Sequence, residues 1–129
     1  IKPKGPLPLA DRLVVIYQGL MEAIQRFQPD QVALEEVFFA KNPSSALKLG
    51  ESRGVALLAA AQAGVAIFEY SARAVKQALT GFGQADKNQI QNMVKAILKL
   101  PEVAEENASD ALAVAVCHCN TNRILSERI

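Results

Sequence analysis

Two acidic side chains occupy positions where a hydrolytic enzyme could hold a metal ion. Glu35 follows the apolar run at residues 32–34, which is typical of a parallel strand buried on both faces. Ligands of open α/β sheets bind beyond the carboxyl ends of the strands, so Glu35 is well placed for chemistry. Asp110 opens an otherwise apolar segment, and we expect its carboxylate to be pressed toward the core unless a cation or hydrogen bonds compensate. Both carboxylates suit Mg²⁺, a cation that supports phosphodiester hydrolysis.

Asn107 lies three residues before Asp110, on the same face of a predicted helix, and could complete an acidic constellation with it. The same spacing also fits a helix N-cap followed by an acidic residue at its third position, which needs no ligand. Both interpretations stay open at this stage. His118 falls late in the same apolar helix, where a hydrogen-bonded structural histidine is favoured over a catalytic base.

Aromatic and basic residues near the two carboxylates predict contact with a nucleic acid. Phe38 and Phe39 follow Glu35, and strand alternation predicts that one ring packs while the other faces a cleft, where it could stack on an unpaired base. Basic side chains could meet phosphates if they line one groove, or could simply form a solvated face. These candidates are Lys41, Lys48, Arg53, Arg73, Lys76 and Lys87.

The composition predicts one globular domain over residues 1–129, because half of the residues are hydrophobic and 21% are charged. The formal charge of +1 means that any nucleic-acid partner would be held by a local basic patch. Cys117 and Cys119 point to different faces of a helix, so we expect two reduced thiols. No long apolar run or leader is present, which predicts a cytosolic protein without a membrane span.

The hydrophobic pattern alternates between helical and strand segments that could position these residues. A helix from Leu9 to Pro29 precedes a strand at residues 31–37, and a long helix opens with Asn42 as N-cap and Pro43 at its first position, running to Gly64. The remaining predictions are a strand at 65–70, a helix from Ser71 to Gly81, a helix from Asp86 to Pro101, and a largely buried helix at about 108–119 with a frayed tail. The strand–helix–strand unit predicts a mainly parallel α/β sheet flanked by helices.

Three segments carry a resemblance to a known family: ALEEVFFAKNPSSALKLGESRGVALLAA from Ala33, FEYSARAVKQALTGFGQADKNQIQNMV from Phe68 and SDALAVAVCHC from Ser109. Over nearly its whole length the chain resembles the bacterial Holliday junction resolvases of the RuvC type, members of the ribonuclease H-like superfamily. The resemblance implies a homodimer that binds four-way DNA junctions and nicks two strands symmetrically with Mg²⁺, for which Mn²⁺ substitutes. It also implies a complex with a branch-migration helicase.

The resemblance assigns roles to particular positions. Glu35 and Asp110 look like two of the family's metal-binding catalytic carboxylates, and Phe38 looks like the aromatic residue that approaches the junction bases. Lys76 and Lys87 match family lysines at the scissile DNA backbone. The helix at residues 43–64 matches the dimer interface, in agreement with its glycines and alanines.

Two departures from the family pattern bear on activity. The family's opening strand, which supplies the first catalytic aspartate, has no counterpart here, so we expect the domain to be incomplete at its N-terminus. Asn107 stands where the family usually carries an aspartate or a histidine, and its amide brings no charge to a metal. The main alternative to a resolvase is therefore a catalytically impaired junction-binding dimer. Another ribonuclease H-like nuclease with a different branched or hybrid substrate is a third possibility.

Overall fold

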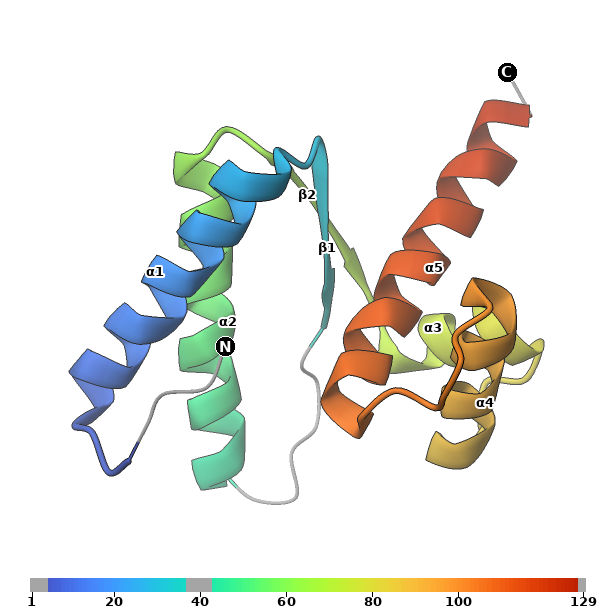
Figure 1. Ribbon diagram of the computed structural model, residues 1–129, viewed down its shortest axis with the longest axis horizontal. Helices are drawn as coiled ribbons and strands as arrows, with labels where there is room; N and C mark the ends of the chain where they lie inside the picture. Colours follow the sequence, from blue (N-terminus) through green and yellow to red (C-terminus); the bar gives the residue numbers. More distant parts are fainter. Residues whose placement is uncertain (1–4, 37–42, 128–129) are drawn as a thin grey trace. The chain divides into compact units, whose positions relative to one another are not determined.

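The computed structural model describes residues 5–36 and 43–127 as a set of helices with a short sheet (Figure 1). In chain order, the elements are α1 (Leu9–Phe27), β1 (Gln31–Glu35), α2 (Pro43–Gln62), β2 (Ala66–Tyr70), α3 (Ala72–Thr80), α4 (Lys87–Leu98) and α5 (Glu106–Glu127). The chain divides into two compact units, which are described separately below. The prediction of one domain over residues 1–129 stays a prediction.

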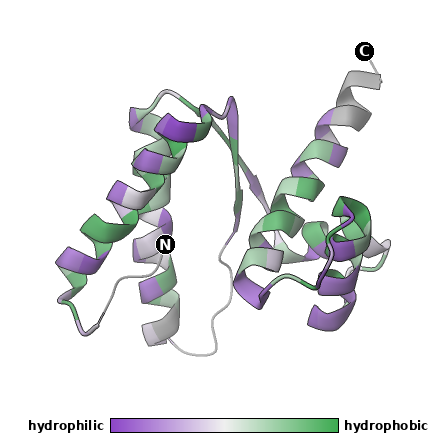
Figure 2. Cartoon of the chain, in the orientation of Figure 1, coloured by the Kyte–Doolittle hydropathy of each residue, from purple (hydrophilic) through white to green (hydrophobic). Residues whose placement is uncertain are grey.

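The first unit comprises Ile1–Val32 and Val37–Ile67, and its described part is dominated by α1 and α2. Figure 2 shows α1 banded in polar and apolar residues, as expected of an amphipathic helix. This helix ends where Gln28 adopts the left-handed conformation, with φ 46°, and Pro29 follows. Gly64 ends α2 with φ 71°. There the N–H of Gly64 donates to the carbonyl of Ala61 at 3.1 Å and that of Val65 to Ala60 at 3.0 Å, a Schellman motif.

The second unit comprises Ala33–Glu36 and Phe68–Ile129, and it holds the core. Ser71 caps α3 by accepting a hydrogen bond from the Ala74 N–H at 3.1 Å. Asp86 and Gln89 form a capping box at the start of α4. The helix starts predicted at Ser71 and Asp86 are confirmed, with both residues acting as N-caps. Helices α3, α4 and α5 enclose a cluster of buried apolar residues: Val75, Leu79, Ala85, Ile90, Val94, Ala113, Val114, Val116 and Cys117.

The sheet pairs β1 with β2, and both strands run in the same direction (Figure 1). Beyond the end of β1, the Glu36 N–H donates to the Tyr70 carbonyl at 2.8 Å. Residues 32–34 are half-buried, so the prediction of a strand buried on both faces is wrong for the described part of the chain. The reason is that each strand has one neighbour in the described sheet.

The last helix differs most from its prediction. Helix α5 begins at Glu106 and runs to Glu127, so the predicted start near residue 108 and the frayed tail after Asn120 are both wrong. Only one face of this helix is buried, because α3 and α4 cover that side while Ala111 and Ala115 stay exposed. Cys117 is buried and Cys119 is exposed, and both are free thiols, as predicted. No helix among residues 5–36 and 43–127 has the length and apolarity needed to cross a membrane.

Candidate active site

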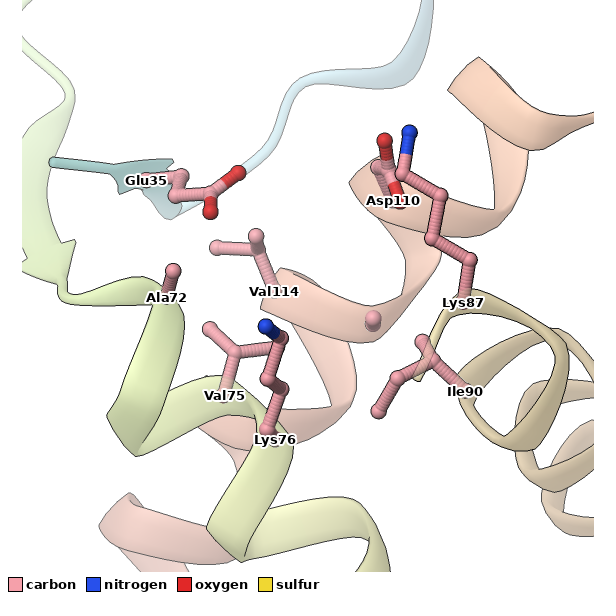
Figure 3. Close-up of a pocket in the computed structure, with 9 residues that line it drawn as sticks. Glu35, Ala72, Val75, Lys76, Lys87, Ile90, Asp110 and Val114 are labelled. Carbon is pink, nitrogen blue, oxygen red and sulfur yellow. The ribbon is translucent and has the colours of Figure 1, made fainter. Parts of the chain in front are cut away.

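A cavity of about 190 Å³ in the second unit brings together both carboxylates singled out in the sequence (Figure 3). Glu35 reaches it from the end of β1, and Asp110 from the first turns of α5. Lys76 of α3 and Lys87 of α4 also line it. The remaining lining is apolar and consists of Ala72, Val75, Ile90, Ala113 and Val114. The arrangement is an apolar floor with two carboxylates and two ammonium groups around it.

The apolar lining makes the charged form of both carboxylates costly. Burial is the main cause of the raised pKa of Glu35, and the negative charge of Asp110 raises it further, while Lys76 lowers it in part. Burial likewise raises the pKa of Asp110; Lys87 opposes this effect, and Glu106 and Glu105 add to it. A further positive charge near the two carboxylates would lower both pKa values and favour their charged forms.

The local fold of α5 decides which way Asp110 points. Ser109 takes the inward position, with 0% of its surface exposed, and its hydroxyl donates to the Ala104 carbonyl at 3.0 Å. Asp110 therefore lies at the rim of the cavity, where solvent reaches it although the apolar lining still raises its pKa, and it is not pressed toward the core as expected. The interpretation of Asn107 as an N-cap is also wrong, because α5 already begins at Glu106 and Asn107 lies inside the helix.

The two cavity lysines differ in their partners. Lys87 Nζ forms an ion pair with Glu106 Oε1, and this contact raises the pKa of the Lys87 ammonium group. Lys76 is half-buried on α3, and Figure 3 shows its ammonium group pointing from α3 toward the side of the cavity where Glu35 lies. Glu106 was not singled out in the sequence. The sequence did offer one indication, because Glu106 lies at the start of a helix, where acidic side chains are favoured by the helix dipole. An acidic side chain there can also attract a nearby cationic group such as Lys87.

Other candidates from the sequence are not part of the cavity lining. Asn107 is exposed on α5 and does not line the cavity. The Arg73 side chain packs over Gly83, where an added Cβ would lie 3.0 Å from it. Lys48 lines a separate cavity between α1 and α2 in the first unit. Phe38, Phe39 and Lys41 lie outside the described residues.

His118 is confirmed as a hydrogen-bonded structural histidine. It is 7% exposed, its Nδ1 contacts the Tyr70 hydroxyl, and its Nε2 lies 3.2 Å from Asn122 Nδ2. The Phe68 ring lies against it, with the ring centroids 4.6 Å apart. Tyr70 was missed as a partner because nothing in a single sequence pairs positions 70 and 118.

The donor set fits a hard divalent cation. Within the described ranges, no group of three or more His, Cys, Asp or Glu side chains could hold a metal ion. Glu35 and Asp110 alone nevertheless match the way Mg²⁺ is bound, through one or two carboxylates with water and substrate oxygens completing the shell.

Comparison with protein families gives one match over residues 1–118, to the family described as crossover junction endodeoxyribonuclease RuvC. Two relatives with that name come from Tolumonas auensis and Geotalea uraniireducens. The first is 55% identical over 117 residues, which are 91% of this chain and 68% of the relative. The second is 56% identical over 111 residues, which are 86% of this chain and 65% of the relative. The chain therefore spans about two thirds of the length of these relatives.

Two solved structures of Thermus thermophilus RuvC have the same fold. Each is 38% identical to this chain and covers 96% of it. The first aligns with a TM-score of 0.87 over 75% of its own chain. The second, described as a complex with Holliday junction substrate, aligns with a TM-score of 0.90 over 76% of its chain.

Proposed function

Because the chain belongs to the RuvC family of crossover junction endodeoxyribonucleases, which resolve Holliday junctions, we propose that the cavity between Glu35 and Asp110 is its centre of phosphodiester cleavage. The observation that carries the proposal is the convergence of two carboxylates from distant parts of the chain on one cavity beside two lysines. The chain has the ribonuclease H-like α/β fold of that family.

Glu35 and Asp110 would hold a divalent cation, Mg²⁺ or Mn²⁺, and this assignment is supported by their convergence on one cavity and by the raised pKa of both carboxyl groups. A bound cation of this kind supplies Lewis-acid stabilisation of phosphate oxygens and an acidified water. Asn107 lies three residues before Asp110 on α5, outside the cavity lining, and is proposed as the third position of the site on the family resemblance alone. Its amide oxygen offers a neutral ligand where a carboxylate would offer a charged one.

Lys76 and Lys87 would contact or neutralise the scissile DNA backbone. Lys76 is directed into the cavity, and Lys87 stands at its rim (Figure 3). The Glu106 carboxylate competes with phosphate for Lys87. We include Phe38, Lys41 and Arg73 in this proposed DNA surface on the basis of the sequence alone.

A homodimer through α2 is the second part of the proposal. One face of α2 is exposed and presents Gly50, Gly54 and Ala61 beside Leu47 and Leu58. Cβ atoms added at either glycine would meet no atom within 4 Å in this chain. Small residues flanked by leucines allow a second helix to approach closely and to cover the leucines.

The test of the cleavage centre is strand nicking of a synthetic four-way junction in Mg²⁺ by Glu35→Gln, with Glu36→Gln as the matched control. Glu36 follows Glu35 directly but does not line the cavity. We expect Glu35→Gln to lose nicking by a factor on the order of 100 or more while its junction affinity stays within about twofold, because charge is removed and volume is kept. Glu36→Gln should nick like the unmodified protein. Undiminished nicking by Glu35→Gln would refute the site.

A further inference from the structure

A buried histidine connects the two elements that carry the cavity carboxylates. His118 lies on α5, the helix of Asp110, about two turns further along. Its Nδ1 contacts the hydroxyl of Tyr70, the last residue of β2. The Tyr70 carbonyl accepts the Glu36 N–H at 2.8 Å, and Glu36 directly follows Glu35. Hydrogen bonds therefore link α5 to the backbone next to Glu35.

The histidine ring is held on three sides, so this link is well defined. Asn122 lies one turn beyond His118 and places its amide 3.2 Å from Nε2. The Phe68 ring packs against the imidazole at an interplanar angle of 37°. Both ring nitrogens therefore have polar neighbours, and the ring plane is fixed by an aromatic side chain of β2.

The rest of the α5 interface is mostly apolar, and its other polar contacts, the Lys87–Glu106 ion pair and the Cys117 Sγ–Ala74 carbonyl contact at 3.8 Å, reach α4 and α3. Its inward residues Ala113, Val114 and Cys117 are small and apolar, and apolar contacts are not directional. A hydrogen bond requires a defined distance and angle. The Tyr70–His118 contact is thus a directional contact that joins α5 to the end of β2, next to the end of β1.

We propose that His118 is a positioning residue, whose hydrogen bond to Tyr70 sets the spacing between the Glu35 and Asp110 carboxylates and thereby their affinity for a shared divalent cation. The inference rests on the proposed function, because it assumes that the two carboxylates bind one cation. It assigns His118 no contact with DNA or with the reacting phosphate.

The test is direct Mn²⁺ binding without DNA, measured at 15 °C from the electron paramagnetic resonance signal of free Mn²⁺. Tyr70→Phe keeps the ring and removes only the hydroxyl. We expect its Mn²⁺ dissociation constant to rise about tenfold, a typical loss when the groups that orient metal ligands are removed. Tyr17→Phe is the matched control, because the Tyr17 hydroxyl contacts Gln62 in the first unit. Its Mn²⁺ affinity should equal that of the unmodified protein.

Two substitutions of the histidine separate positioning from mere packing. Asn at position 118 retains a polar atom near the place of Nδ1, facing Tyr70, whereas Gln retains one near the place of Nε2, facing Asn122. His118→Asn should therefore bind Mn²⁺ within about threefold of the unmodified protein, and His118→Gln should be weakened like Tyr70→Phe. A purely structural role predicts lower melting temperatures for these variants with unchanged Mn²⁺ affinity at 15 °C, and that result would overturn the inference.

Glu35→Gln in the same titration distinguishes failure of this inference from failure of the proposed function. Loss of Mn²⁺ binding in Glu35→Gln with an unchanged affinity in Tyr70→Phe would refute the positioning role alone. An unchanged affinity in Glu35→Gln would refute the cation site itself, and the positioning role with it. Weaker Mn²⁺ binding by both Glu35→Gln and Tyr70→Phe, with near-normal binding by His118→Asn, supports both proposals.

Discussion

The two compact units bury their apolar residues in different ways. In the second unit, α3, α4 and α5 enclose a common core in which Val94 is 0% exposed. In the first unit, α1 contains no buried residue, and α2 leaves Leu47 and Leu58 65% and 52% exposed. The unit that contains the Glu35–Asp110 cavity is supported by its own core. The α1–α2 unit presents apolar surface of the kind that a protein partner covers.

This difference separates two requirements of a junction resolvase. Two carboxylates can hold a cation only when their spacing is fixed, and a well-packed core fixes the helices that carry them. An assembly surface has the opposite requirement, because its apolar residues must stay available until the partner binds. Four experiments can contradict or refine this comparison.

The largest effect is expected from truncation of a core residue in the second unit. Val94→Ala should lower the free energy of unfolding by about 2–3 kcal/mol, because a cavity forms in a packed core. The comparison variant Leu47→Ala removes a side chain of the first unit that is exposed in the single chain, and it should cost less than about 0.5 kcal/mol at protein concentrations low enough to keep the chain monomeric. Chemical denaturation of the metal-free protein measures both values. Equal losses would mean that the two units do not differ in packing.

The next effect concerns assembly through α2. A Cβ added at Gly54 meets no atom within 4 Å in this chain, so Gly54→Leu should retain the fold, but its side chain would keep a second α2 helix from approaching closely. We expect the dimer dissociation constant, measured by sedimentation equilibrium, to rise at least about tenfold. Lys95→Leu on α4 serves as a control that adds an apolar surface residue in the other unit. A dimer constant unaffected by Gly54→Leu would remove α2 from the interface.

A moderate effect is expected from the cavity lysines. Lys76→Ala and Lys87→Ala should each weaken junction binding about fivefold and make the slope of log affinity against log salt shallower by about 0.9. Lys48→Ala, in the α1–α2 cavity, is the matched control and should change neither quantity if DNA is bound by the second unit alone. Fluorescence anisotropy at several salt concentrations gives both values. A slope that stays the same for Lys76→Ala and Lys87→Ala would exclude direct phosphate contacts.

The smallest effect is a pH dependence of stability. The pKa of Glu35 is raised above its ordinary value of 4.5, so the folded metal-free protein binds more protons than the unfolded chain above that pH. Stability therefore falls as pH rises from about 4.5 through the folded pKa, and Glu35→Gln removes this contribution. At pH 7 the melting temperature of Glu35→Gln should exceed that of the unmodified protein by about 1–3 °C, with no difference at pH 4.

The control for this pH effect is Glu51→Gln, which changes a carboxylate at the α1–α2 cavity of the first unit. Its melting temperature should follow that of the unmodified protein at both pH values. Addition of Mn²⁺ at pH 7 should reverse the order and make the unmodified protein the more stable one, since a ligand stabilises the form that binds it. If Glu35→Gln melts below the unmodified protein at pH 7 without metal, the charged Glu35 carboxylate does not destabilise the folded metal-free protein, and the prediction is wrong.

Local sequence was sufficient wherever structure depends on neighbouring residues. Ser71, Asp86 and Gly81 mark helix ends correctly because a cap or a left-handed turn involves groups three or four positions apart. The two carboxylates could also be singled out, since their charge contradicts the apolar segments around them. That they converge on one cavity together with Lys76 and Lys87 was inferred from a family resemblance, because no local pattern links these positions.

Tertiary structure alone decided the orientation of α5 and the long-range partners. The sequence of an apolar helix gives little indication of which side will be covered by neighbouring elements. Successive helical residues point about 100° apart, so Ser109 and Asp110 cannot both face inward. Packing against α3 and α4 placed Ser109 inward and Asp110 at the rim of the cavity. The pairing of Tyr70 with His118 spans 48 positions, and that of Lys87 with Glu106 spans 19. Such contacts depend on how whole elements pack, because short-range hydrogen bonds and helical periodicity fix each element but not its neighbours.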